Sequence, residues 1–210
     1  MKLISIHPIR TRKDRTEWLH HHFKDIFKRG VVLDVGCADA PLRNMIGKDK
    51  YFGIDVIGNY DLKINLENIN KLPFKKNEFE TTICIEVLEH LDNLHAIAND
   101  LFRVTKSHLL ISLPNSWRDS RMQIKRGKGV IGHYGLPITK PLDRHKWFIN
   151  TQEAVLFFQK IKPKNYQLEI TITEPKRFFM KKLLRGLWYS PQAYQNKFGQ
   201  TVWAKYSKIK

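Results

Sequence analysis

The sequence predicts an α/β fold in which a mainly parallel, seven-stranded sheet carries helices on both faces. Short runs rich in valine and isoleucine alternate along the 210 residues with segments whose apolar residues recur at helical spacing. The first run is apolar at nearly every position, which is typical of a strand covered on both faces. Strands connected through helices pair in parallel by right-handed crossovers. The length suits one such domain and is too short for two.

The N-terminal part predicts a helix followed by the first strand. Thr16 can cap a helix in which Leu19 and Phe23 follow helical spacing, and Gly30 is placed to end it. Residues 31–35 form a β-branched run with one carboxylate that leads directly into a glycine. Further strands are expected at residues 51–56, 61–66, 81–87, 108–113, 166–173 and 201–206.

The later helices and one long connection follow from the same patterns. Leu94, Ile97 and Leu101 recur at helical spacing after Asp92 and Asn93, either of which can cap that helix. Further helices are expected at residues 151–160 and in a basic insertion at residues 176–188. Periodicity is poor over residues 115–150, where a connection of this length predicts a lid or a binding loop.

Positive charge is concentrated outside the middle of the chain. The net charge is +17, yet residues 30–116 carry 9 basic and 12 acidic side chains. Residues 117–149 carry 8 basic and 2 acidic side chains, and residues 155–210 carry 12 and 2. A basic surface favours an anionic partner, such as a phosphorylated small molecule, an acidic glycan or nucleic acid. A solvated, lysine-rich surface explains the same charge equally well.

The composition argues against several other classes of protein. No run approaches the roughly 18 apolar residues that cross a bilayer, and the first 15 residues lack the apolar core of a secretory signal. We therefore expect a cytoplasmic protein without a transmembrane segment. Of the two cysteines, Cys37 falls in a glycine-type loop and Cys84 in an apolar strand, which indicates neither a disulfide framework nor a zinc site.

A strand and a tight turn mark the expected ligand site. In parallel sheets, ligands bind at the carboxyl ends of the strands, where Gly36 follows the first strand. The turn lacks the further glycines of a dinucleotide site, and Asp34 stands two residues before Gly36. A carboxylate disfavours a pyrophosphate and favours S-adenosylmethionine, which carries an ammonium and a sulfonium. Asp55, at the end of the second strand, is placed to accept hydrogen bonds from the ribose hydroxyls of an adenosine.

Four motifs together resemble a known family, the class I S-adenosylmethionine-dependent methyltransferases, and in particular their type 11-like group. The resemblance covers roughly residues 30–115. It implies a Rossmann-like fold and one domain over residues 1–210, with a cofactor-binding core, a substrate-side loop or lid, and a C-terminal part at residues 30–116, 117–150 and 151–210. The motifs are Val32–Cys37, Tyr51–Asp55, Leu72–Phe74 with Asn77 and Phe79, and Glu86–Leu91.

The resemblance also implies roles for individual residues. The loop from Gly36 to Ala38 would approach the methionine moiety, and Asp55 would hold the ribose. Asn65 and Leu66 would lie near the adenine. The full set of expected cofactor residues is Asp34, Gly36, Cys37, Ala38, Asp55, Val56, Asn65, Leu66, Ile85 and Glu86.

Three residues depart from the family pattern. Ala38 and Ala40 stand where the family usually has glycine, and Asn65 stands where aspartate is common. If the backbone of this loop adopts a positive φ angle, the alanine methyl groups are expected to crowd the methionine end and to weaken binding.

Glu86, Glu89 and His90 have the spacing of one helical turn and offer oxygen and nitrogen ligands. Similar stretches bind a divalent ion in ubiquinone-pathway O-methyltransferases and in terminal ribose methyltransferases that act on small RNAs. The stretch also resembles that of class I enzymes without a metal, where it shapes the pocket. A divalent metal is therefore the less favoured interpretation.

The long connection supplies the candidate catalytic residues. Methyl transfer to a hydroxyl requires an aligned acceptor, a group that removes its proton, and exclusion of water. His145, which follows Asp143 and Arg144, is the preferred general base, and His133 is the second. A structural hydrogen bond within a packed loop is an equally good interpretation of either histidine.

The same connection supplies candidate substrate-binding residues. Arg144 and Lys146 are expected to hold an anionic substrate, and Tyr134 and Trp147 can stack on a ring. Three functions follow in order of preference. The first is O-methylation of an anionic small molecule or glycan precursor, and the second is RNA methylation by the basic surface. The third is a non-catalytic nucleic-acid-binding or scaffold protein on a degenerate methyltransferase fold.

Overall fold

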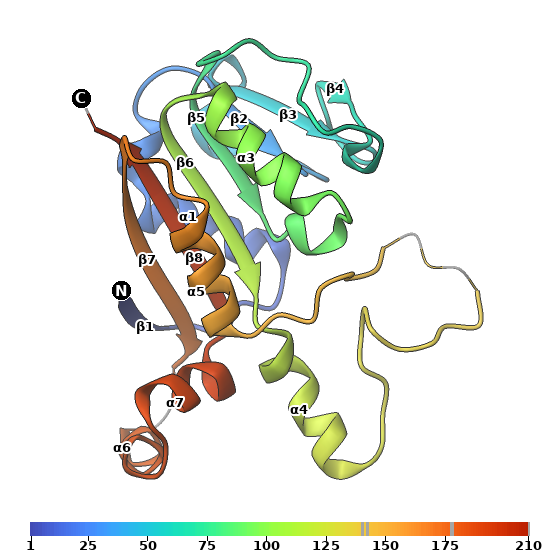
Figure 1. The fold of residues 1–210 in the computed structure, drawn as a ribbon, viewed down its shortest axis with the longest axis vertical. Helices are drawn as coiled ribbons and strands as arrows, with labels where there is room; N and C mark the ends of the chain where they lie inside the picture. The colour runs from blue at the N-terminus through green and yellow to red at the C-terminus, as the bar shows by residue number, and fades with distance from the viewer. Residues whose placement is uncertain (140, 142, 177–178, 210) are drawn as a thin grey trace.

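Eight strands form one sheet in the order β1-β7-β8-β6-β5-β2-β3-β4 (Figure 1). The computed structural model describes residues 1–139, 141, 143–176 and 179–209. Every strand is parallel to its neighbours except β8, which runs antiparallel to both β6 and β7. The strands are β1 (Lys2–Ile6), β2 (Val32–Val35), β3 (Tyr51–Asp55), β4 (Leu62–Lys63), β5 (Phe79–Ile85), β6 (Thr105–Pro114), β7 (Tyr166–Pro175) and β8 (Thr201–Lys208).

Helices cover both faces of the sheet. One face packs against α3 and α5, and the opposite face packs against α1 (Figure 1). The α-helices are α1 (Arg12–His22), α2 (Arg43–Ile46), α3 (Leu94–Val104), α4 (Ser116–Arg126), α5 (Thr151–Lys160), α6 (Phe179–Trp188) and α7 (Pro191–Phe198). Short 3-10 helices are η1 (Lys24–Phe27), η2 (Lys48–Lys50), η3 (Leu66–Asn68) and η4 (Leu88–His90). None of the helices in the described ranges is long and apolar enough to cross a membrane.

The mainly parallel α/β architecture is confirmed, and the count of seven strands is wrong by one. The additional strand, β1, pairs in parallel with β7 at the edge of the sheet, with Lys2 opposite Thr171. Its five residues contribute one fully buried side chain, Ile6, so the segment lacks the apolar run that marks a central strand.

Two helices differ from the sequence-based expectation. The first begins at Arg12, because Thr11 and Asp14 form a capping box, and Thr16 instead bonds to the Arg12 carbonyl inside the helix. The connection predicted as irregular contains α4, which Asn115 caps and which ends at Gly127 in the left-handed conformation. Its large apolar side chains are mostly exposed, so no buried stripe announced it.

The carboxyl ends of β2, β3, β4, β5 and β6 meet at one edge of the sheet. The helix α4, the segment of residues 127–148, and the pair α6 and α7 all project beyond this edge (Figure 1). The expected cofactor and catalytic residues lie on the turns and loops that leave these strands, so the topology gathers them into one region.

Candidate active site

The turn after β2 adopts the backbone that the sequence left open. Gly36, Ala38 and Ala40 have φ angles of 78°, 46° and 51°, so both alanines lie in the left-handed region. The turn is held from β3: the Ala38 N–H donates to Asp55 Oδ2 over 2.8 Å, and the Ala38 carbonyl accepts from Asn59 N over 2.6 Å. A left-handed alanine costs about 1–2 kcal/mol, so neighbouring contacts keep this turn in a strained form.

Asp55 is fixed by the backbone around it. Its Oδ1 accepts from the Val56 N–H over 2.6 Å and from the Ile57 N–H over 3.3 Å, while Oδ2 accepts from Ala38. A carboxylate oxygen has two lone pairs, so Oδ2 retains acceptor capacity toward a hydroxyl. The side chain is oriented before any ligand arrives, as a ribose contact requires.

Asp34 lies in a narrow cavity behind the turn. It is buried and accepts a hydrogen bond of 2.7 Å from the Tyr51 hydroxyl. Burial raises the pKa of Asp34 to about 6, against the opposing effects of Tyr51 and the nearby Arg12. The cavity is also lined by Gly36, Cys37 and Ile85, which are three further expected cofactor residues.

Two arginines of α1 complete this cavity, and the sequence analysis missed both. Arg12 and Arg15 line it opposite Asp34, so one small space carries a carboxylate and two guanidinium groups. Arg15 forms an ion pair with Glu86, which also accepts a hydrogen bond of 3.0 Å from the Thr201 hydroxyl. Glu86 has a φ angle of 52°, a strained conformation at the end of β5.

A larger polar cavity of about 340 Å³ adjoins the narrow one and shares Arg12 and Arg15 with it. Arg10 adds a third guanidinium group, and Glu86 and Asp119 are the acidic residues in the wall. The residues come from both ends of the chain, since Gln200 and Thr201 at the start of β8 form the opposite side. An arginine-rich cavity beside a carboxylate-bearing one can hold an anion next to a cation.

Three histidines gather near the end of β5. The rings of His133 and His145 stack with their centroids 4.3 Å apart, and the His90 ring meets His145 edge-on at 4.5 Å. Asp143 lies 2.5 Å from His90 Nδ1 and 4.0 Å from His133 Nδ1. The three candidate catalytic residues from the sequence, namely His145, His133 and Asp143, are therefore brought together with His90.

Tyr134 orients His145. The Tyr134 hydroxyl donates to the Trp147 carbonyl over 2.8 Å and lies 3.0 Å from His145 Nδ1 and 2.5 Å from Ser116 Oγ. Because the tyrosine proton is used toward the carbonyl, His145 Nδ1 is the donor of its bond and the lone pair of the ring resides on Nε2. Burial and the two neighbouring histidines lower the pKa of His145 to about 3, so its ring is neutral at physiological pH.

Glu89 tests whether this region fits a metal ion. The side chain is fully buried, and within the described ranges neither carboxylate oxygen has a hydrogen-bond partner. Burial raises its pKa well above the usual range. One ligand atom each of Glu89, His90 and His145 lies within 4.8 Å of the others. Two imidazoles and a carboxylate fit a divalent ion, whereas Glu86, the third residue of the predicted set, is paired with Arg15.

The remaining predicted residues occupy more exposed positions. Lys146 is held by ion pairs with Glu67, over 2.8 Å, and with Asp92. The Arg144 side chain is exposed. Asn65 caps η3 through a bond to the Glu67 N–H, beside the buried Leu66, and Val56 is partly exposed after β3. Substrate and adenine contacts by these residues stay predictions.

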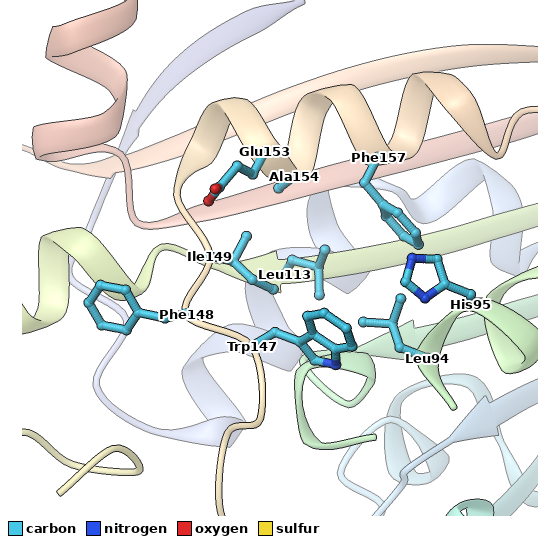
Figure 2. Close-up of a pocket in the computed structure, with 9 residues that line it drawn as sticks. All are labelled: Leu94, His95, Leu113, Trp147, Phe148, Ile149, Glu153, Ala154 and Phe157. Atoms are coloured by element: carbon cyan, nitrogen blue, oxygen red, sulfur yellow. The ribbon is translucent and has the colours of Figure 1, made fainter. Parts of the chain in front are cut away.

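An apolar cavity of about 240 Å³ lies beside the histidine cluster. Figure 2 shows Trp147 and Ile149 of the connecting segment facing Leu94 and His95 of α3, with Leu113 of β6 at the base. The Trp147 indole N–H donates to the Leu91 carbonyl over 2.8 Å, which fixes its ring as one wall. The predicted stacking residue Trp147 therefore belongs to a cavity that favours an apolar group.

Comparisons with known proteins agree with this geometry. A family model described as a methyltransferase domain matches residues 10–154. An uncharacterized protein of Methanocaldococcus jannaschii is 34% identical over 83 residues, which are 37% of this chain and 36% of the relative. The chain thus matches about a third of the length of that curated relative.

Solved structures share the fold at low sequence identity. An S-adenosylmethionine-dependent methyltransferase from Archaeoglobus fulgidus is 14% identical, with 94% of each chain covered and a TM-score of 0.59. The small RNA methyltransferase HEN1 is 13% identical, with a TM-score of 0.58 over 98% of this chain and 27% of HEN1. Magnesium protoporphyrin IX methyltransferase from Synechocystis, solved with bound S-adenosylhomocysteine, is 14% identical with a TM-score of 0.53, covering 93% and 80%. The chain therefore belongs to the methyltransferase domain family: it is a methyltransferase with the S-adenosylmethionine-dependent fold.

Proposed function

We propose that the protein transfers the methyl group of S-adenosylmethionine to a hydroxyl oxygen of an anionic small molecule or glycan precursor. The observation that carries the proposal is the pair of adjoining cavities that share Arg12 and Arg15. One contains the buried Asp34 and suits a zwitterion, and the other is rich in arginine and suits an anion. Methyl transfer requires these two ligands side by side.

The narrow cavity and the turn supply the cofactor contacts. The carboxylate of Asp34 complements the ammonium of the methionine moiety, and the guanidinium groups of Arg12 and Arg15 complement its carboxylate. Asp55 accepts from the ribose hydroxyls, next to Val56. By resemblance, Asn65 and Leu66 contact the adenine, while Gly36, Cys37, Ala38, Ile85 and Glu86 line the remainder.

The histidine cluster supplies the acid–base chemistry. The acceptor oxygen attacks the methyl carbon of the sulfonium, the carbon–sulfur bond breaks, and a neutral thioether leaves. His145 Nε2 takes the acceptor proton, while Tyr134 holds the opposite nitrogen. Asp143 and the stacked His133 ring position this base. The apolar cavity beside Trp147 accepts a nonpolar part of the acceptor.

A divalent ion is a second use of the same cluster. Glu89, His90 and His145 would hold it, and when bound it would lower the pKa of the acceptor hydroxyl. Removal of divalent ions by a chelator distinguishes the two uses. Activity that survives chelation favours His145 as the base, and activity that is lost and then restored by one added metal favours the ion.

Ligand-induced stabilisation tests the proposal directly. Millimolar S-adenosylmethionine or S-adenosylhomocysteine should raise the melting temperature, because a ligand that binds only the folded state stabilises it. Methylation of hydroxyl-bearing anions, such as sugar phosphates and uronic acids, should then be followed by transfer of a labelled methyl group. The absence of any thermal shift with both ligands would remove the enzymatic proposal and leave the non-catalytic alternative, which the strained Ala38 and Ala40 motivate.

RNA is the second candidate substrate. Residues 117–149 carry 8 basic and 2 acidic side chains, Trp117 on α4 is exposed, and HEN1 is a similar structure that is named as a small RNA methyltransferase. Binding to RNA through phosphates must weaken steeply with salt. If the affinity for a short RNA does not change between low and physiological salt, this candidate fails.

A further inference from the structure

The helix α6 displays an apolar stripe to the solvent. Four large apolar side chains recur at positions i, i+4, i+7 and i+8, the spacing of a single helix face. Of the described helices, α6 is also the most strongly amphipathic. The side chains, with their exposed fractions, are Met180 (63%), Leu184 (52%), Leu187 (77%) and Trp188 (82%).

A basic residue, and not an apolar one, attaches α6 to the rest of the molecule. The Arg185 guanidinium lies 4.4 Å from the centre of the Phe198 ring on α7. The following Tyr189 packs against the same ring, with the centroids 5.7 Å apart. A surface helix ordinarily turns its apolar face inward. Here α6 turns that face outward, so the arrangement leaves apolar area for an external partner.

Charge discriminates among the possible partners. Residues 176–188 carry five basic and no acidic side chains, within a chain of net charge +17. Pairing the same face of two copies would bring ten positive charges together, which opposes self-association. Methionine and leucine side chains offer neither hydrogen bonds to phosphates nor rings for stacking on bases, which argues against RNA. An anionic lipid surface satisfies both the apolar stripe and the positive charge.

A second group of exposed apolar residues projects from the same end of the molecule. Ile124 on α4 and Val130, Leu136 and Ile138 on the following segment are all largely exposed. This region and α6 both extend beyond the carboxyl edge of the sheet (Figure 1). A flat surface that touches α6 therefore lies on the same side as the candidate active site.

We propose that α6 docks this protein on the surface of an anionic lipid bilayer. The helix lies in the plane of the interface, with Met180, Leu184, Leu187 and Trp188 in the headgroup region and its basic residues beside anionic headgroups. This inference concerns attachment and goes beyond the proposed methyl transfer. Docking brings the acceptor cavity to the membrane surface, where it can receive a membrane-associated acceptor.

Vesicle co-sedimentation of the full chain tests the proposal. We expect binding to phosphatidylcholine vesicles that contain about 30% phosphatidylserine, little binding to phosphatidylcholine alone, and weakening at high salt. The variant Leu184→Ser/Leu187→Ser should lower the partition coefficient at least about tenfold, because both side chains leave the interface. The matched control is Leu156→Ser, which makes the same change at a 60% exposed leucine on α5 and should bind normally.

The outcomes are distinct. Failure of the folded protein to bind anionic vesicles, or equal loss of binding in Leu156→Ser and the α6 variant, overturns the proposal. So does a dimer, detected by analytical ultracentrifugation, or an RNA complex that the α6 variant abolishes while vesicle binding persists. The assay contains no S-adenosylmethionine, and thermal stabilisation by that ligand is measured separately, so failure of the proposed methyltransferase activity leaves this test intact.

Discussion

Replacing Ala38 by glycine should stabilise the protein, although the same change destabilises most structures. The Ala38 φ angle of 46° costs about 1–2 kcal/mol for an alanine and almost nothing for glycine. Against this gain, glycine adds about 0.4–1 kcal/mol of conformational entropy to the unfolded chain. The side chain is only partly buried, so little packing is lost. The net stabilisation is about 0.5–1 kcal/mol, which for a chain of this size raises the melting temperature by about 1–4 °C.

Two control variants sharpen this prediction. Ala40 has a φ angle of 51° but is buried, so Ala40→Gly loses about 0.8 kcal/mol of methyl burial and should change stability little. Ala96 lies inside α3, where Ala96→Gly should cost about 1 kcal/mol through helix propensity. Differential scanning calorimetry of the three variants checks the order. If Ala38→Gly melts below the wild type, as Ala96→Gly should, the left-handed turn is not the strained element and the reasoning fails.

Four other predictions concern the site. Asp55→Ala should weaken S-adenosylmethionine binding about 10–100-fold, because the ribose acceptor and the support of the Ala38 turn are both lost; calorimetry that finds an unchanged dissociation constant would contradict this placement. His145→Ala should lower kcat about 10²–10⁴-fold and leave cofactor affinity intact; a parallel loss of affinity would indicate a structural role instead. The Asp34 pKa is raised from 3.8 to about 6, so the folded state binds more protons than the unfolded state between these values, and this group's contribution to stability falls as pH rises through the window. The stability of Asp34→Asn relative to wild type should therefore increase from pH 4 to pH 7, and chemical denaturation that finds no such trend would refute the burial argument. Glu89→Gln should remove any stabilisation of the protein by added Mn²⁺ or Zn²⁺, and stabilisation that persists in the variant would place the ion elsewhere.

The sequence predicts the central strands well because their signals are local. Residues 31–35 are consecutive apolar positions, and the structure buries all of β2 on both faces. By contrast, β1 pairs with β7, which follows more than 160 residues later, and its own pattern is too short to reveal that partner. The exposed apolar residues of α4 left no periodic stripe to detect, so this helix was expected to be irregular.

The candidate site was predictable only in part, for related reasons. The turn at Gly36 and the aspartate that ends β3 are recognisable because strand and turn chemistry is encoded in adjacent residues. Arg12 and Arg15 were missed because a basic residue on a surface helix is ordinarily solvated, and only the packing of α1 across the strand ends turns these two inward. The approach of His90 to His145 depends on the path of a long connection, which residue spacing does not encode.

The polar cavity has walls from opposite regions of the chain, and this has a consequence for biosynthesis. Gln200 at one side donates to the Ile9 carbonyl across 191 residues of sequence, and Thr201 holds Glu86. Contacts of such large separation form late, since the intervening chain must already be ordered. A nascent polypeptide that still lacks β8 therefore has an open cofactor region without an enclosed acceptor chamber, and catalytic competence arises only when translation of that strand is complete.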